Sequence, residues 1–190
     1  MLKIKKIKRS KINKKNCFKL YKFLINNIND TTFKIFGYSF FLESLKVNFE
    51  NSYYIEKNKK IISYISYVDE INEKKIKRIL ISYLIKNPLR YVYTLIKNIK
   101  FFFKLHSHPK DFIQLMHLII KLETRGNFII KKKLNKMIDN LHKKKVNQNY
   151  KGIYAMYGNE NFIAAKYYKK NMYKIYNKNY FYTFVKKKIK

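Results

Sequence analysis

Cysteine, proline, glycine and tryptophan are scarce in this sequence. Of its 190 residues, one is cysteine, two are proline, four are glycine and none is tryptophan. The single thiol, Cys17, excludes a disulfide within the chain and a zinc site built from cysteines. A hydrophobic core rather than covalent cross-links must therefore hold the fold together, and 47% apolar residues are enough for one core or two small ones.

Long apolar runs are absent as well. The uncharged segment 112–120 is short, whereas a membrane-spanning helix needs about 20 apolar residues. The sequence therefore predicts no transmembrane helix. Residues 1–9 lack both the apolar core and the small-residue cleavage site of a secretory signal. We interpret residues 1–16 as a basic N-terminal arm.

Acidic residues are few, and the resulting charge narrows the function. Eleven Asp and Glu stand against 44 Lys and Arg, which gives a formal net charge of +33. A free-standing soluble enzyme of this charge would repel itself and adhere to polyanions. The aromatic content of 17% argues against simple disorder. A folded protein neutralised by a polyanionic partner is expected, with nucleic acid as the first candidate and an anionic membrane as the second.

The basic residues are almost all lysine, since only Arg9, Arg78, Arg90 and Arg125 are arginine. Lys, Asn, Ile, Tyr and Phe, which have A- and T-rich codons, dominate the composition. This bias is typical of organellar genomes and of some AT-rich nuclear ones, and it makes any one lysine a weak indication of function. An arginine, glycine or alanine is a stronger one.

The first half of the chain is predicted to mix helices with a β-hairpin. Apolar residues recur at helical spacing over 17–28, and short aromatic and β-branched runs follow over 32–68. Within that stretch, residues 52–68 read as a hairpin with a polar turn. Asp69 can cap a helix that ends near Ile85. For residues 89–105 both helix and strand stay open.

The second half predicts an α+β domain over residues 106–190, with two helices packed on a small, mainly antiparallel sheet. The first helix would start at Pro109 and end at Leu122, and the second would span 128–144. Residues 152–158 and 173–185 read as strands. Residues 17–105 would form a separate N-terminal region before this domain.

The helix at 128–144 separates its side chains by type. At 100° per residue one sector is apolar, and the opposite side is basic. A solvated lysine face is the ordinary interpretation of such a pattern. The net charge and the lysines that continue to Lys145 favour contact with phosphates instead. The apolar sector comprises Ile130, Leu134, Met137, Ile138 and Leu141, and the basic side comprises Lys131, Lys132, Asn135 and Lys136.

Several weak motifs in order resemble the C-terminal domain of the universal small-subunit ribosomal protein S-three family. They are a proline before a helix, Leu-Glu-x-Arg-x-x-Phe, a basic helix and Lys-Gly-Ile, then Gly, Ala-Lys and a Thr-containing strand. The matching positions are Pro109, 122–128, 131–140, 151–153, Gly158, 165–166 and 181–184. The family's KH domain has no counterpart, because the four glycines form no Gly-x-x-Gly loop.

The resemblance implies a structural protein of an organellar, mitochondrial small ribosomal subunit, encoded in the organelle. It would lie in the head near the entrance for messenger RNA, with ribosomal RNA, messenger RNA and neighbouring ribosomal proteins as partners. The missing KH half implies either a split protein, with that half on a separate chain, or a diverged one. No catalysis, metal, cofactor or small-molecule substrate is expected. The RNA-binding residues carried over, with the lysines that extend the basic helix, are Arg125, Lys131, Lys132, Lys136, Lys143, Lys144, Lys151 and Lys166.

Three alternatives have some support. His106, His108, Asp111 and His117 could ligate a metal, although polar or RNA-contacting histidines are the favoured interpretation. The acidic residues between Glu43 and Glu73 could pair as catalytic carboxylates, but caps and ion pairs explain them better. Finally, residues 89–105 could form an interfacial amphipathic helix in a peripheral subunit of an organellar inner-membrane complex.

Overall fold

A computed structural model describes residues 2–9, 12, 14–27, 31–86, 88, 92, 109, 111–146 and 150–189. The strands are β1 (Leu2–Lys6), β2 (Ser52–Lys57), β3 (Lys60–Val68), β4 (Phe112–Ile120), β5 (Gly152–Gly158), β6 (Lys174–Lys178) and β7 (Tyr182–Lys188). The helices are α1 (Lys14–Asn27), α2 (Thr31–Asn48), the 3-10 turn η2 (Phe49–Asn51), α3 (Glu70–Lys86), α5 (Leu122–Arg125), α6 (Phe128–Val146) and α7 (Phe162–Lys170).

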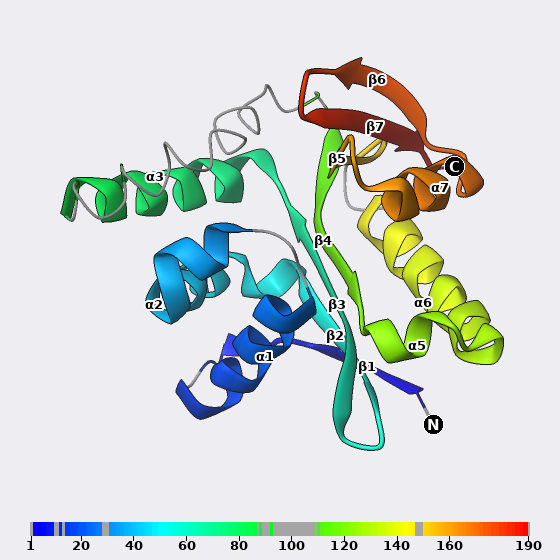
Figure 1. The fold of residues 1–190 in the computed structure, drawn as a ribbon, viewed down its shortest axis with the longest axis horizontal. Helices are drawn as coiled ribbons and strands as arrows, with labels where there is room; N and C mark the ends of the chain where they lie inside the picture. Colours follow the sequence, from blue (N-terminus) through cyan, green and yellow to red (C-terminus); the bar gives the residue numbers. More distant parts are fainter. Residues whose placement is uncertain are drawn as a thin grey trace.

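Within the described part of the chain, these strands form one seven-stranded sheet in the order β1-β2-β3-β4-β5-β7-β6 (Figure 1). Neighbouring strands run antiparallel, except that β4 and β5 are parallel. The parallel pair requires a crossover, which α5 and α6 supply. The sheet therefore contains a single β-α-β unit at its centre.

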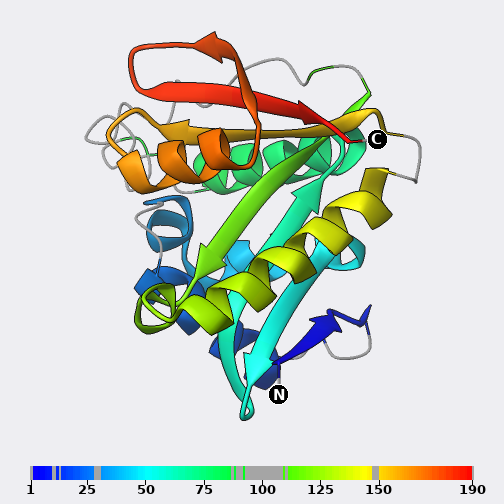
Figure 2. The same ribbon diagram turned by 90° about the vertical axis from the view of Figure 1, so that its right-hand side faces the viewer.

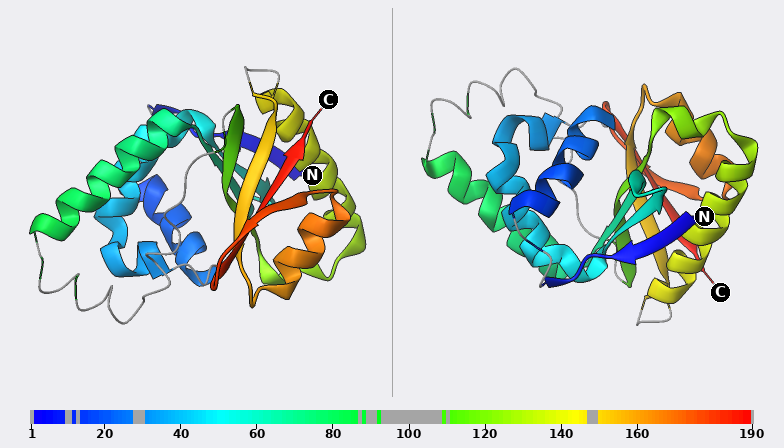
Figure 3. Two further views of the ribbon diagram at one scale, coloured as in Figure 1. Left: turned by 90° about the horizontal axis from the view of Figure 1, so that it is seen from above. Right: turned by 90° about the horizontal axis from the view of Figure 1, so that it is seen from below.

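Helices cover both faces of the sheet. Helices α1, α2 and α3 lie on one face and α6 and α7 on the other, as the views along the sheet show (Figure 3). Each face has its own core. Leu24 of α1 and Phe40 and Phe41 of α2 are buried in the core between these helices and the sheet. On the other face, Leu134, Ile138 and Ile153 are buried between the sheet and α6. Burial on both faces explains why the central strands are nearly all apolar.

Several sequence predictions are confirmed. Helix α1 matches the helical spacing at 17–28, and β2 and β3 form the predicted hairpin. The Asp69 carboxylate accepts a hydrogen bond from the backbone N–H of Asn72 at 2.8 Å, so it does cap α3. Helix α6 and strands β5, β6 and β7 also lie where the pattern put them.

Helix α6 has the predicted two-sided character. Leu134, Ile138 and Leu141 are buried against the sheet, and Ile130 and Met137 pack at the edge of the same core. The three lysines at 131–133 and Lys136 are exposed on the other side. The apolar stripe thus fixes which face of α6 meets the sheet.

The predicted first helix of the second half is wrong, because residues 112–120 form the central strand β4. Apolar residues at helical spacing also occur in a strand that is covered on both faces, so the periodicity was ambiguous. The two-helix C-terminal domain on a small sheet is wrong for the same reason: β4 and β5 belong to a sheet with strands from the whole chain. The broader α+β class is confirmed.

Three further elements differ from the sequence predictions. Residues 31–48 form α2, kinked at Gly37 (φ 78°), for which the short aromatic and β-branched runs gave no helix prediction. The basic arm contains β1, which pairs with β2 and leads into the buried Ile7. Residues 162–170 form α7, which the sequence analysis missed. Apart from Val92, residues 89–105 lie outside the described residues, and the three-part division of the chain stays a prediction.

Candidate functional site

The parallel strands β4 and β5 pair only over their first halves. Their ladder runs from Phe112 and Gly152 to Leu115 and Ala155. On its other side β4 pairs with β3 as far as Ile120, and the register shift there leaves Met116 opposite no residue of β3. Met116 is thus a β-bulge at the point where β4 leaves β5. Because a bulge bends its strand and increases the twist, it accounts for the divergence.

The divergence opens toward the carboxyl ends of both strands. In Figure 2, β4 and β5 begin close together and their arrowheads point apart, with α6 crossing the same face. The chain leaves β4 into α5 and α6 and leaves β5 into α7. In open sheets with a β-α-β unit, ligands bind beyond the carboxyl ends of the parallel strands. The divergence is therefore the candidate site.

The start of α6 lies on the β4 side of this opening. Asn127 precedes the helix, and its side-chain oxygen accepts a hydrogen bond from the backbone N–H of Ile130 at 3.0 Å. Gly126, Asn127, Phe128 and Ile129 are exposed, and the first turn contains no acidic residue. A helix of 19 residues concentrates a partial positive charge at this end. This end can bind the phosphate groups of a ligand.

Helix α7 and its tyrosines lie on the β5 side. Asn161 caps α7 by accepting a hydrogen bond from the N–H of Ala164 at 3.0 Å. The ring of Tyr168 stacks on Tyr157, which belongs to the diverging half of β5, with 5.5 Å between centroids. The Tyr173 ring meets Tyr168 edge-on at 5.0 Å. A cluster of phenols thus lies beside the opening.

These phenols keep their protons at neutral pH. Burial, with a smaller contribution from the neighbouring phenols, raises the pKa of Tyr168 above its usual range. Burial likewise raises the pKa of Tyr167 and Tyr173. A protonated phenol can donate a proton to a group that develops negative charge.

The residues predicted to bind RNA are spread over several elements. Lys131, Lys132 and Lys136 share the exposed face of α6, and Lys143 and Lys144 lie exposed near its end. Arg125 is the last residue of α5, and Lys166 is exposed on α7.

Lys151 precedes β5 and pairs with Asp111 at 2.7 Å. The structure brings only the α6 residues together. No observation tests this set of residues as a binding site.

Met116, Asn127 and Tyr168 were not predicted as site residues from the sequence. Asn127 before an apolar-periodic segment is a cap signal that could have been found. The bulge at Met116 depends on pairing with β3, which the sequence does not reveal. Tyr168 lies in a stretch rich in Tyr and Lys, where nothing in the sequence sets it apart from its neighbours.

The proposed metal ligands do not assemble in the part of the chain that the structure describes. There, no three His, Cys, Asp or Glu residues are grouped so that they could hold a metal ion. His106 and His108 lie outside that part. His117 is buried in β4, not on the polar face of a helix, and its Nδ1 lies 2.8 Å from the Ser66 hydroxyl.

The same fold occurs in solved structures of low sequence identity. A protein from Pyrococcus horikoshii is 14% identical, with a TM-score of 0.62 over 100% of this chain and 99% of that chain. An N-acetyltransferase from Staphylococcus aureus is 13% identical, with a TM-score of 0.59 over 97% and 100%. The PaiA N-acetyltransferase from Thermoplasma acidophilum, solved with coenzyme A, is 12% identical, with a TM-score of 0.52 over 100% and 99%.

At such identities the likeness establishes the fold alone. No protein-family model matches the chain, and no curated protein matches it in sequence.

This fold contradicts the ribosomal interpretation. The Staphylococcus aureus and Thermoplasma acidophilum neighbours are N-acetyltransferases, not ribosomal protein S-three, and the resemblance of residues 108–183 to that family is wrong. The predicted structural role in a small ribosomal subunit is therefore also wrong, and so is the alternative of a membrane-complex subunit.

The predicted ribosomal RNA and messenger RNA partners fall for the same reason, and a neighbour with coenzyme A contradicts the expected lack of a small-molecule substrate. The enzymes among these neighbours likewise contradict the prediction of no catalysis. Among the described helices none is long and apolar enough to cross a bilayer. The mitochondrial location stays a prediction.

Proposed function

We propose that the protein is an N-acetyltransferase that moves an acetyl group from acetyl-CoA to a primary amine. The observation that carries the proposal is the divergence of β4 and β5 at the Met116 bulge, in a fold shared with N-acetyltransferases. The complex of one such neighbour with coenzyme A supports this choice of ligand.

The opening suits the shape and chemistry of acetyl-CoA. Coenzyme A carries a long amide-containing arm that ends in a thiol, and a pyrophosphate group at its other side. An extended amide chain can lie along a strand and hydrogen-bond to its backbone. The diverging half of β4, which begins at Met116, would receive the arm, and the first turn of α6 would receive the pyrophosphate.

The thioester supplies an activated acetyl group, and the tyrosines beside the opening can assist its transfer. The amine nitrogen bonds to the carbonyl carbon, the carbon–sulfur bond breaks, and the amine loses a proton to water. Tyr168 would give its phenolic proton to the departing sulfur and regain one from solvent. A phenol carries its proton at neutral pH even at its ordinary pKa of about 10, so Tyr168 has a proton to give.

Binding of coenzyme A can be tested at the start of α6 without disturbing the fold. Ile129 is the second residue of α6 and is 66% exposed, and Ile71 is the second residue of α3 and is 68% exposed. A glutamate at either position favours its helix through the macrodipole. Ile129→Glu should weaken coenzyme A binding by calorimetry roughly five- to thirtyfold through repulsion of phosphate. Ile71→Glu should not.

The transfer itself is tested by the release of free thiol from acetyl-CoA in the presence of a panel of peptides and small amines. Tyr168→Phe should lower kcat by about a hundredfold or more, the usual contribution of a proton donor, with little change in coenzyme A affinity. Tyr83→Phe, at a tyrosine of α3 on the other face of the sheet, is the control. If the wild-type protein binds no coenzyme A, or if both glutamate variants bind it equally well, the proposal is refuted.

A further inference from the structure

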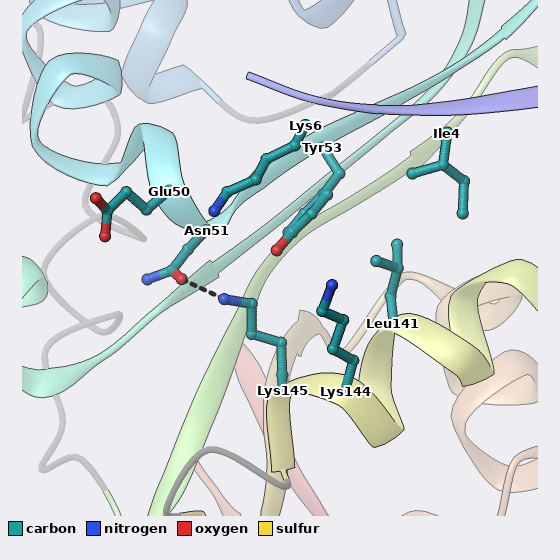
Figure 4. A pocket seen from close by; sticks show the side chains of 8 residues that line it. All are labelled: Ile4, Lys6, Glu50, Asn51, Tyr53, Leu141, Lys144 and Lys145. Atoms are coloured by element: carbon teal, nitrogen blue, oxygen red, sulfur yellow. Dashed lines mark hydrogen bonds between the residues drawn. The ribbon is translucent and has the colours of Figure 1, made fainter. Parts of the chain in front are cut away.

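A second site lies at the opposite end of α6 from the opening. A hollow of about 480 Å³ is lined by residues of β1, β2, η2 and the end of α6 (Figure 4). Lys145 on its wall is 17 residues beyond Phe128, about 26 Å along the helix. The hollow is thus distinct from the proposed acetyl-CoA site and independent of it.

Three ammonium groups converge on this hollow. Lys6 comes from the end of β1, and Lys144 and Lys145 come from the last turn of α6. Figure 4 shows all three side chains extending into the same space. Glu50 is the acidic residue of the lining, and its carboxylate points away from the lysines in this view. The lining therefore carries an excess of two positive charges.

Lys145 is the unusual member of the group, because it is only 7% exposed. Its Nζ donates a hydrogen bond to the Asn51 side-chain oxygen at 2.6 Å and lies 5.7 Å from the centre of the Tyr53 ring. In the described part of the chain no carboxylate lies within ion-pair distance of it. Burial, and then the charges of Lys6 and Lys144, lower the pKa of Lys145, and the more distant carboxylates of Glu50 and Asp69 oppose this shift only in part. A buried ammonium without a directly bonded counter-ion is costly unless a ligand supplies one.

The hollow also contains an unused neutral donor. Tyr53 is 6% exposed, and within the described chain its hydroxyl makes no hydrogen bond. An ammonium has three N–H donors, of which Lys145 uses one on Asn51. The remaining donors of Lys145, with those of Lys6, Lys144 and Tyr53, can serve an anion that has several acceptor oxygens.

We propose that this hollow binds the phosphate group of a small molecule. Phosphate has more oxygens than a carboxylate, so it can accept from donors on three sides, and lysines bind it as point charges. The volume falls within the range of small-molecule sites and exceeds what one phosphate needs. The ring of Tyr53 and the side chains of Ile4 and Leu141 offer an apolar wall for an organic group.

The site is tested by calorimetry on the full chain at constant ionic strength, with inorganic phosphate and phenyl phosphate as probes and sodium chloride as the blank. Lys145→Met keeps the apolar stem and removes the charge, so the variant should fold, as circular dichroism will confirm. It should bind either probe about ten- to a hundredfold more weakly. Lys133→Met, the same change at an exposed position of α6, should bind like the wild type.

Tyr53→Phe provides a second variant that removes one hydroxyl and leaves the charges in place. It should weaken binding severalfold. Tighter binding of phenyl phosphate than of inorganic phosphate would assign the site to an organic monoester, and equal binding would assign it to free phosphate. The proposal is overturned if neither probe binds saturably, or if Lys145→Met and Lys133→Met bind with equal affinity.

Discussion

Acidification should destabilise the protein through one buried histidine. His142 on α6 is 3% exposed. Its Nδ1 lies 2.6 Å from the Tyr67 hydroxyl and its Nε2 lies 3.4 Å from that of Tyr173. In either neutral tautomer of the imidazole, one phenol donates a hydrogen bond to the ring and the other accepts one from it. Burial, and next the charge of Lys187, lower the pKa of His142 to about 3.

The sign and size of the effect follow from the two pKa values. In the unfolded chain the imidazole binds a proton below its ordinary pKa of about 6.5, whereas the native ring stays neutral down to about pH 3. The contribution of His142 to stability is therefore complete above pH 6.5 and is lost as the pH falls toward 3. The free energy of unfolding should decrease with a slope that approaches about 1.4 kcal/mol per pH unit below pH 6, or roughly 2 kcal/mol in all between pH 6.5 and 4.5.

Urea unfolding followed by circular dichroism at several pH values measures this loss. His142→Gln keeps a donor and an acceptor between the two phenols and removes the titrating group. The wild-type free energy of unfolding should fall more steeply with acid than that of the variant. Parallel curves for the two proteins between pH 6.5 and 4.5 would refute the assignment, whatever their offset.

Three other predictions concern the core. Gly152→Ala should cost about 3 kcal/mol or more in thermal unfolding, because a Cβ there would collide with the Lys187 carbonyl oxygen and the Phe112 ring, whereas Gly158→Ala on the same strand should be tolerated. Leu134→Asp should abolish the far-ultraviolet spectrum of the fold, since an unpaired charge at this buried position costs several kcal/mol against a stability of about 5–15 kcal/mol. Burial raises the pKa of Tyr67 and Tyr154 above 10, so their contribution to stability is complete below pH 10 and is lost as the pH rises further. Tyrosinate absorbance should then appear for these residues only as the chain unfolds.

The spacing of apolar and polar residues correctly predicted the elements that have one buried face and one exposed face. Helix α6 has a single apolar stripe, and the β2–β3 hairpin has a polar turn at Asn58 and Lys59. Both were found from sequence because their periodicity is unambiguous. The central strand β4 was missed because neither face is polar, and helix α2 was missed because apolar side chains surround it on most sides.

The candidate site could not have been derived from sequence, since it depends on how distant segments pair. The bulge at Met116 exists only relative to Ser66 and Tyr67 of β3. Likewise, Lys145 looks like its two lysine neighbours in sequence, and only the approach of Asn51 and Tyr53 distinguishes it. The net charge was misleading for a related reason, because it reports the composition of the surface and not the fold beneath it.

The lysine-rich sequences of β1 and β6 have a consequence for solubility. These two strands form the borders of the sheet, where backbone groups are available to any passing strand. Lys3, Lys5 and Lys6 lie on one border, and Lys174 and Lys178 lie on the other. Two copies that approached border to border would bring these charges together, so edge-to-edge aggregation is opposed. The lysines of the two edge strands therefore disfavour intermolecular strand pairing at both edges of the seven-stranded sheet.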